Sequence, residues 1–408
     1  MSRINVDALH SEDGGSSNIE LDDSRNTTCK GNLTVDGNIS VTGTGLTDTL
    51  SFRNLIYNGD CRIAQRGTSS TSNGFNTIDR WKTYTTSHSV TTVTASQQSL
   101  SSSDTGPWAK GFRKYSRIAL SGAGTAAAGT QMFTYQPLES QDIANSGWDY
   151  TSSSSYLQLS FWVRSSTAQA FPIGLYTKDG TEKLYTTTYT VSSANTWEKK
   201  TIQIPGATGL QFDDNNGEGI RIYLACPYHG TDYTSAASNA TWVDYAATKK
   251  FVAVPSTWLT AGASTLDFTG VQLEVGSSAT EFEHRTYGEE LARCQRYFYM
   301  HCDGSRHNEE SIGVMSSYGT NNWYCFCPFP VTMREGTPSL YKVMDTSYIA
   351  LMSGAGDQDM CGDVSTTAQE SANGYMVKFT NNVSNTTGHA GWAYIANSSA
   401  RIGFDAEF

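Results

Sequence analysis

The chain has 408 residues, enough for two or three domains. Charged residues make up 16% of it, against about 25% in an ordinary soluble protein, and Ser, Thr, Asn and Gly replace them, which favours all-β domains with long polar loops. The net charge of −11 argues against a nucleic-acid partner, because phosphate binding needs clusters of Lys and Arg. Membrane insertion is not expected either, since no apolar run reaches the length of a membrane span.

Residues 1–25 form a polar segment of mixed charge. Such a segment has no regular structure unless a partner orders it. It also lacks the apolar core of a secretion signal, so synthesis in the cytoplasm of the producing cell is expected.

Residues 26–53 contain the stretch GNLTVDGNISVTG, in which one six-residue pattern occurs twice. Its apolar positions alternate, which is a strand signal, and Asp36-Gly37 indicates a tight turn. Two strands this short are marginally stable alone in water, so the sequence predicts a partner that covers their apolar side chains. Those side chains belong to Leu33, Val35, Ile39 and Val41.

Residues 54–285 consist of strand-length segments separated by Gly, Ser, Asn and Pro, which is typical of a β-sandwich. Examples are SYLQLSFWVRSS, TWEKKTIQIPG, GIRIYLACPY and STLDFTGVQLEVG. The first alternates most clearly. It predicts one buried face formed by Tyr156, Leu157, Leu159, Phe161 and Val163.

One helix is predicted after this region, in RTYGEELARCQRYFYM. Thr286 is the expected N-cap, and Glu289 completes a capping box with it. Leu291, Cys294 and Phe298 would form one apolar stripe. The stripe packs on a β-domain or lies at an oligomer axis, and both alternatives stay open.

Residues 286–408 then resume strand-like runs and predict a second β-sandwich behind the helix. The eight cysteines are scattered through the chain without a Cys-x-x-Cys pair, so we expect buried, reduced thiols and no metal site.

Clusters of Asn and aromatic residues in turns are the candidate binding sites, because loops often carry function and Tyr and Trp are frequent at binding surfaces. The candidates are Tyr318, Asn321, Asn322, Trp323 and Tyr324 in one cluster, Trp392, Tyr394 and Asn397 in a second, and Trp108 in the middle region.

Catalysis is not expected. Glu289 and Glu290 would diverge on a helix, and Asp213 and Asp214 lie in a Gly/Asn-rich turn, so neither pair suits glycoside hydrolysis. No Gly-x-Ser-x-Gly motif is present, and the seven histidines form no recognisable triad.

Three stretches carry a family resemblance. They are NLIYNGDCRIAQRG (54–67) followed by Asp79-Arg80-Trp81, then GVQLEVGSSATEFEHR (270–285), then YGEELARCQRYFYM (287–300). Together, and in this order, they resemble a widespread family of bacteriophage tail-fibre and receptor-binding proteins. The stretch GNLTVDGNISVTG resembles stalk segments of marine and cyanobacterial phage fibres.

The middle region also resembles carbohydrate-binding jelly rolls. The matching segments are Asn58-Gly59-Asp60, Ser160 to Val163, Thr196 to Lys199 and Gly270 to Glu274. Such modules often hold a structural calcium with paired aspartates before the last strand. The matching positions here are Thr269 and Gly270, with Asp267 displaced, so we expect no cofactor and leave calcium as the alternative.

The resemblance implies a homotrimeric fibre in the virion. Residues 1–25 would attach to the tail or an adaptor protein, 26–53 would form a trimeric β stalk, 54–285 a jelly roll, and 286–408 the helix with a receptor-binding tip. The hexad side chains and the helix stripe would be trimer contacts, and the partner would be a host surface glycan. A purely structural virion fibre and a polysaccharide depolymerase are the alternatives.

Overall fold

The computed structural model describes residues 8–9, 19–21, 27–29, 53–90, 92–319, 321–353, 357–380 and 386–408. The chain divides between Ser51 and Phe52 into two compact units. The four apolar side chains of the hexad stretch, Leu33, Val35, Ile39 and Val41, lie outside the described residues.

The first unit contains a small antiparallel sheet in the order β1-β2-β3. Its strands are β1 Ala8–Leu9, β2 Ile19–Leu21 and β3 Thr27–Cys29. The expectation that residues 1–25 have no regular structure without a partner is therefore wrong for β1 and β2, whereas β3 lies beyond that segment. The residues of the three strands include β-forming Ile and Thr, which favour an extended backbone despite the polar composition.

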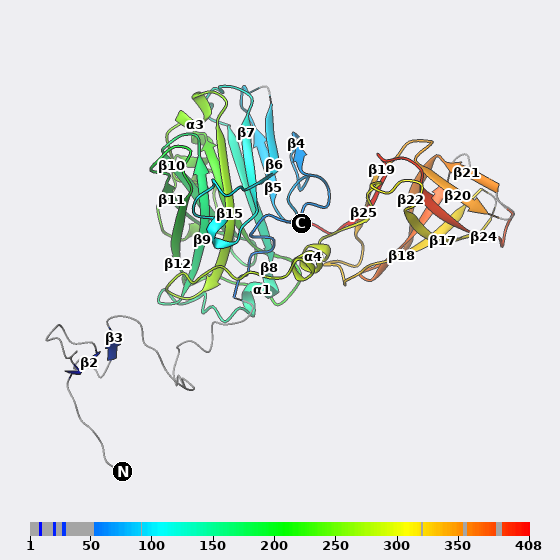
Figure 1. Cartoon of the computed structure of the whole chain (residues 1–408). Helices are drawn as coiled ribbons and strands as arrows, with labels where there is room; N and C mark the ends of the chain where they lie inside the picture. Colours follow the sequence, from blue (N-terminus) through cyan, green and yellow to red (C-terminus); the bar gives the residue numbers. More distant parts are fainter. Residues whose placement is uncertain are drawn as a thin grey trace, which may run out of the picture. The chain divides into compact units, whose positions relative to one another are not determined.

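The second unit begins with a sandwich of two six-stranded antiparallel sheets, shown in Figure 1. We call it the sandwich module. In sheet order, the first sheet comprises β14 Val243–Asp244, β11 Lys183–Thr190, β10 Ala170–Thr177, β13 Glu218–His229, β8 Gln131–Glu139 and β5 Lys82–Thr86. The second comprises β12 Glu198–Pro205, β9 Tyr156–Ser165, β15 Thr265–Val275, β7 Lys114–Leu120, β6 Val93–Ser99 and β4 Ser69–Ser70.

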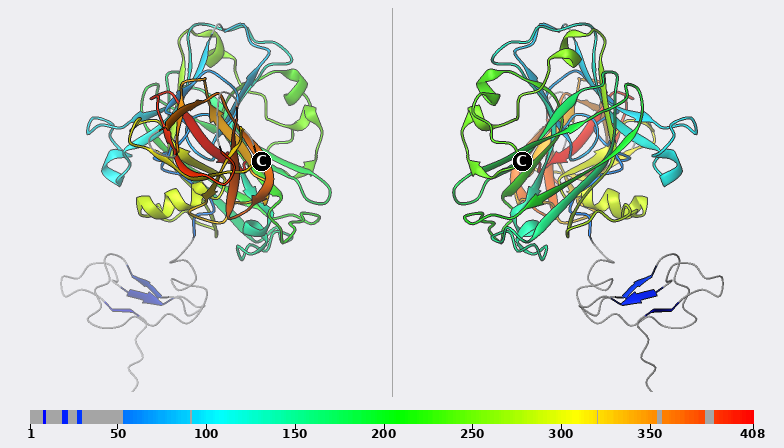
Figure 2. Two further views of the ribbon diagram at one scale, coloured as in Figure 1. Left: turned by 90° about the vertical axis from the view of Figure 1, so that its right-hand side faces the viewer. Right: turned by 90° about the vertical axis from the view of Figure 1, so that its left-hand side faces the viewer.

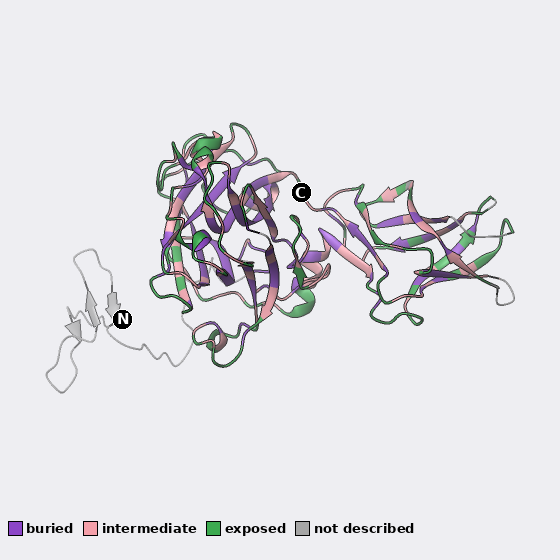
Figure 3. Cartoon of the chain, turned by 90° about the horizontal axis from the view of Figure 1, so that it is seen from above, coloured by how far each residue is buried: buried purple, intermediate pink, exposed green. Residues whose placement is uncertain are grey.

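The core of the sandwich module lies between the two sheets, whose buried residues are purple in Figure 3. The alternation predicted for β9 is confirmed for Leu157, Leu159, Phe161 and Val163, all of which are buried in this core. Tyr156 is only partly buried. Alternate residues of β10 and β13 meet them from the other sheet, as period-two strands require.

Helices are short, and the all-β fold class is confirmed. The α-helices are α1 Ser140–Ala144, α2 Thr231–Thr234, α3 Thr257–Thr260 and α4 Tyr287–Gln295. Two 3₁₀ turns, η1 Trp108–Lys110 and η2 Ala247–Lys249, lie in loops.

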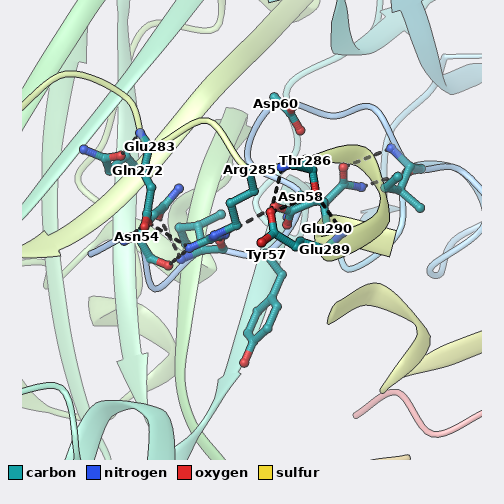
Figure 4. A network of polar contacts seen from close by, with 12 residues as sticks. Asn54, Tyr57, Asn58, Asp60, Gln272, Glu283, Arg285, Thr286, Glu289 and Glu290 are labelled. Carbon is teal, nitrogen blue, oxygen red and sulfur yellow. Dashed lines mark hydrogen bonds and ion pairs between the residues drawn. The ribbon is translucent and has the colours of Figure 1, made fainter. Parts of the chain in front are cut away.

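The three sequence blocks that carry the family resemblance meet in one polar network, drawn in Figure 4. The Asn54 Oδ1 atom accepts hydrogen bonds from the backbone of Ile56 and Leu273, which joins the first block to β15. Arg285 pairs with Glu283 and with Glu290 of α4, which joins the second block to the third. These residues therefore hold the module together from the inside.

A second group of strands, the C-terminal module, follows α4 and is coloured orange and red in Figure 2. Its three-stranded sheet comprises β16 Phe298–Cys302, β25 Arg401–Asp405 and β19 Ser339–Val343. In order, its seven-stranded sheet comprises β21 Asp357–Cys361, β20 Ile349–Ser353, β24 Ala390–Ile395, β17 Ser311–Ser317, β18 Trp323–Pro328, β23 Gly374–Thr380 and β22 Asp363–Ser371.

The last residues of the chain contact the sandwich module. Arg80 is fully buried, forms an ion pair with Glu407, and places its guanidinium carbon 3.3 Å from the ring centroid of Tyr297. Phe408 packs against the sandwich core. The C-terminal module is thus fastened to the sandwich both where it begins and where it ends.

The capping box of α4 is confirmed: the Thr286 side chain accepts from the Glu289 backbone, and the Glu289 side chain accepts in return. The helix ends earlier than predicted, and Phe298 belongs to β16. Cys294 and Phe298 are fully buried within one chain, so the prediction that they are trimer contacts is wrong, because no surface remains for a partner. Leu291 is only partly buried.

Seven cysteines lie in the described second unit, and all seven are free thiols with buried side chains. They are Cys61, Cys226, Cys294, Cys302, Cys325, Cys327 and Cys361. The predicted burial is confirmed for these residues.

Candidate functional site

The seven-stranded sheet of the C-terminal module has one face in the core and one face outside. In β18 the side chains of Trp323, Cys325 and Cys327 point inward and are buried, whereas Tyr324 and Phe326 point outward. The neighbouring strands alternate in the same way, with Met315 of β17 buried in the core. This alternation defines an outer face whose side chains the module does not cover.

Strand register gathers apolar side chains into one row across this outer face. Trp392 of β24 pairs with Val314 on one side and with Met352 on the other. Phe326 pairs with Met376, and the pairing of Met315 with Cys325 places Val314 beside Phe326. We call Met352, Trp392, Val314, Phe326 and Met376 the apolar row. At about 4.8 Å between strands, its five members span about 19 Å.

The centre of the apolar row is open to solvent. Val314 is 77% exposed, Trp392 53% and Phe326 52%. Isolated exposed apolar residues are normal, but a contiguous group of this kind marks a surface that binds something. None of the five side chains is ionisable, so the row itself is suited to binding rather than to acid–base chemistry.

Tyrosines flank the row at one end of the strands. Tyr318, in the loop after β17, is 77% exposed, and its ring lies edge-on to Tyr324 with 6.4 Å between the centroids. Tyr324 pairs across the strands with Lys378, which adds a cation beside the two phenol groups. The face therefore combines flat apolar surface with hydrogen-bonding groups at its edge.

Phe326 is held in place by a glycine on the next strand. A side chain at Gly374 would come within 2.2 Å of the Phe326 ring, so the ring occupies the space that a Cβ atom would need. Because the ring is packed on the backbone on one side, its other side is presented outward in a fixed orientation.

Among the candidates predicted in this module, three exposed or half-buried aromatic residues share the outer face: Tyr324, Trp392 and Tyr394. Trp323 is 1% exposed and belongs to the core, so its prediction as a contact residue is wrong. Its neighbours in the sequence point the other way because strand side chains alternate.

The predicted asparagines lie in turns. Asn321 has a φ of 61°, the left-handed region that asparagine tolerates, just before β18. Asn322 is the next residue and is half-buried. Asn397 accepts a hydrogen bond from the backbone of Ser399, an interaction that stabilises a turn.

Trp108 lies in the sandwich module, on η1. Its ring is half-buried beneath the guanidinium of Arg113, 3.8 Å from ring centroid to guanidinium carbon, and packs against the cluster of Leu100, Phe112, Tyr115 and Trp197. Nearby, Phe112, Trp162 and His284 line a cavity of about 300 Å³ that Trp108 itself does not line.

The segment expected to resemble a calcium site does not fit a cation. Asp267 is fully buried, and its two carboxylate oxygens receive hydrogen bonds from Arg117 and Arg164. The Thr269 hydroxyl donates to the backbone carbonyl of Lys114. Two guanidinium groups already neutralise the acid, so no calcium is assigned here.

Four members of the apolar row are absent from the sequence-based candidates: Val314, Phe326, Met352 and Met376. For Phe326, the signal is the alternation of WYCFC: once Cys325 and Cys327 are taken as buried, Phe326 must face outward. For Val314, the run SIGVMSS is ambiguous, since a register irregularity lies between Ser311 and Gly313.

Comparisons with known proteins establish no family. No family model matches the chain, and no curated protein sequence matches it. Among solved structures it is similar to the enzymatically active domain of tailspike protein 4 of bacteriophage CBA120, at 12% identity and a TM-score of 0.29, over 55% of this chain and 21% of that one. The chain thus spans about a fifth of that tailspike domain.

Sugar-binding proteins are similar at the same level. A putative sugar binding protein from Bacteroides thetaiotaomicron matches at 11% identity and a TM-score of 0.30, over 55% of this chain and 100% of that one. A xylan-binding domain from Paenibacillus barcinonensis matches at 10% identity and a TM-score of 0.25, over 53% of this chain and 97% of that one. TM-scores of this size establish no function for this chain.

None of the helices in the described ranges has the length and apolar character that a membrane crossing requires.

Proposed function

We propose that this chain is a phage tail fibre that attaches the virion to polysaccharide on the host surface, and that the outer face of the seven-stranded sheet is its adhesion surface. One observation carries the proposal. The exposed side chains of Trp392, Val314 and Phe326 form a contiguous row, with the exposed Tyr318 and the half-buried Tyr324 beside it. Aromatic rings can stack on the C–H faces of sugar rings, and phenol groups can bind hydroxyls.

The row also suits a repeating ligand. Its members come from five strands that are neighbours in the sheet, so equivalent apolar contacts recur at intervals of about 4.8 Å along one line. An extended saccharide chain could lie along this line with successive units in contact. In a homotrimer, three such faces would bind together, and avidity would exceed the affinity of each face alone.

The experiment measures adsorption of labelled full-length protein to host cells and binding to an array of bacterial surface polysaccharides. The variant is Trp392→Ala combined with Phe326→Ala. We expect binding to fall at least tenfold, which corresponds to about 1.4 kcal/mol, while the melting temperature changes little because both side chains are more than half exposed. Enzymatic removal of surface glycans should have the same effect on the wild type.

Tyr287→Ala is the matched control, since Tyr287 is 58% exposed on α4 and lies outside the sheet. It should adsorb like the wild type. Unchanged adsorption of the double variant would show that the outer face is not the adhesion surface. Adsorption that survives glycan removal would exclude polysaccharide as the receptor, and no adsorption by the wild type would favour a purely structural fibre.

A further inference from the structure

The sandwich module has a second feature, a cavity on the outer side of its first sheet. The cavity holds about 340 Å³ and is lined by Lys82, Tyr84, Gln131, Phe133, Tyr135, Arg221, Tyr223 and Lys250. Register brings three of these residues together, because Lys82 of β5 pairs with Tyr135 of β8, which pairs with Tyr223 of β13. The sheet therefore forms a floor of aromatic rings.

The segment between β14 and β15 forms one wall of the cavity. Phe251 is fully buried and packs over Gly174, where a Cβ atom would come within 3.2 Å of its ring. This anchors the preceding residue, Lys250, whose ammonium lies 4.6 Å from the ring centroid of Phe133 and 4.9 Å from that of Tyr223. The ammonium thus faces the aromatic floor.

The positive charge in the cavity is not balanced by protein carboxylates. Within the described ranges, neither Lys250 nor Lys82 forms an ion pair; Lys250 donates only a 3.3 Å hydrogen bond to Gln131, and Lys82 lies 5.2 Å from the ring centroid of Phe75. Arg221 is paired with Glu218. No carboxylate is among the lining residues. Withdrawing an ammonium from water is costly unless an anion compensates it.

A hydroxyl group in the same place also lacks a regular hydrogen bond. Tyr223 is 1% exposed, and its buried hydroxyl interacts with the guanidinium of Arg221 but forms no hydrogen bond of regular geometry within the described chain. Buried polar groups are nearly always satisfied, so an unsatisfied one beside a cavity points to a ligand atom that completes it. The hydroxyl can donate to the same anionic group that Lys250 would neutralise.

We propose that this cavity binds an acidic saccharide unit, with its carboxylate or sulfate at Lys250, Lys82 and the Tyr223 hydroxyl, and its sugar ring against the tyrosines. The aromatic floor suits a ring, and the unbalanced cations suit its acidic substituent. The site is separate from the apolar row and does not depend on the function proposed for that row.

The test is calorimetric titration of the full-length protein with trigalacturonate, with a sulfated carrageenan tetrasaccharide, and with neutral maltotriose. We expect an acidic saccharide to bind at least tenfold more tightly than maltotriose. The acidic saccharide that binds more tightly shows whether the cavity prefers a carboxylate or a sulfate group. Equal binding of maltotriose, or binding of neither acidic saccharide by the folded protein, would overturn the proposal.

Three variants test whether the saccharide binds in this cavity. Lys250→Gln should weaken binding at least tenfold, and Tyr223→Phe, which keeps the ring and removes the hydroxyl, about threefold. Lys249→Gln is the matched control, because Lys249 is the preceding residue on η2 and does not line the cavity. If Lys250→Gln binds like the wild type, or Lys249→Gln weakens binding equally, the site is wrong. Circular dichroism checks that each variant is folded.

Discussion

Two tryptophans of one sheet, on strands β18 and β24 with β17 between them, show that the face of the sheet decides whether a side chain is buried. Trp323 is fully in the core, whereas Trp392 is 53% exposed on the outer face. Trp323→Ala should lower the free energy of unfolding by about 3–5 kcal/mol, as for other buried tryptophans. Trp392→Ala should change it by about 0.5 kcal/mol or less. Urea denaturation of both variants measures this, and equal losses would contradict the assignment of faces.

The sequence contains the information that separates these residues. Cys325 and Cys327 lie on the same face as Trp323, since every second residue of a strand shares a side. Cysteines are usually buried, so they place Trp323 inside with them. The predicted binding cluster is chosen because Asn and aromatic residues are frequent in that stretch. This criterion does not consider the alternation, so it places residues of opposite faces in one group.

Lys250 should make the binding of acidic saccharides depend on pH. Burial is the main cause that lowers the pKa of its ammonium to about 8, and Arg221 lowers it further. A bound anion favours the protonated form, so affinity should fall as the pH rises from 7 to 9.5. Titration with the preferred acidic saccharide at several pH values measures this, and a flat profile in the wild type would contradict it.

Other groups around Lys250 should not produce the same profile. They are Lys82, Tyr84, Tyr135, Tyr176, Glu218, Arg221, Tyr223, Cys226, His229 and Lys249. Burial raises the pKa of Tyr135 and of the Cys226 thiol, and it lowers the pKa of His229 well below its usual range. The residual binding of Lys250→Gln should therefore vary little between pH 7 and 9.5.

The lowered pKa of Lys250 also affects the stability of the unliganded protein. An unfolded lysine has a pKa of about 10.4, so between pH 8 and that value the unfolded chain binds more protons than the folded one. The free energy of unfolding should rise with pH across this window, because the cost of burying the ammonium is fully present only below about pH 8.

At the scale of elements, α4 depends on its cap. Thr286→Ala removes the hydroxyl that accepts from the Glu289 backbone and should cost about 1 kcal/mol. Thr286→Ser keeps that hydroxyl and serves as the control. Thermal unfolding compares the two, and equal melting temperatures would show that the cap contributes nothing.

Elements differ in how far the sequence predicts them. The capping box of α4 and the alternation of β9 involve neighbours a few residues apart, and both are confirmed. The end of α4 was not predicted, because pairing of β16 with β25 withdraws Phe298 from the helical pattern. The cavity around Lys250 combines strands β5, β8 and β13 with a later loop, and no local pattern indicates which strands are neighbours.

At the scale of the whole second unit, the buried pair of Arg80 and Glu407 couples its two modules. Their side chains are 0% and 4% exposed. Glu407→Ala leaves the Arg80 charge buried and unpaired, which should cost about 3–5 kcal/mol. We expect the urea transition to shift and to separate into two steps, as the C-terminal module is released.

A double replacement by apolar residues tests the cause. In Arg80→Met with Glu407→Leu both charges of the pair are removed, and the buried Arg66, which also contacts Glu407, keeps its ion pair with Asp405, so most of the lost stability should return. A double variant as unstable as Glu407→Ala would mean that the geometry of the ion pair, rather than an orphaned charge, holds the modules together.

The buried free thiols allow local opening to be measured separately in each module. Cys226 lies in the sandwich module, and Cys325 and Cys361 lie in the C-terminal module. A thiol sealed from solvent reacts with an alkylating reagent only when its surroundings open, so its labelling rate measures the free energy of that opening. Mass spectrometry of labelled peptides could therefore follow the two modules separately in the intact protein, without any introduced probe.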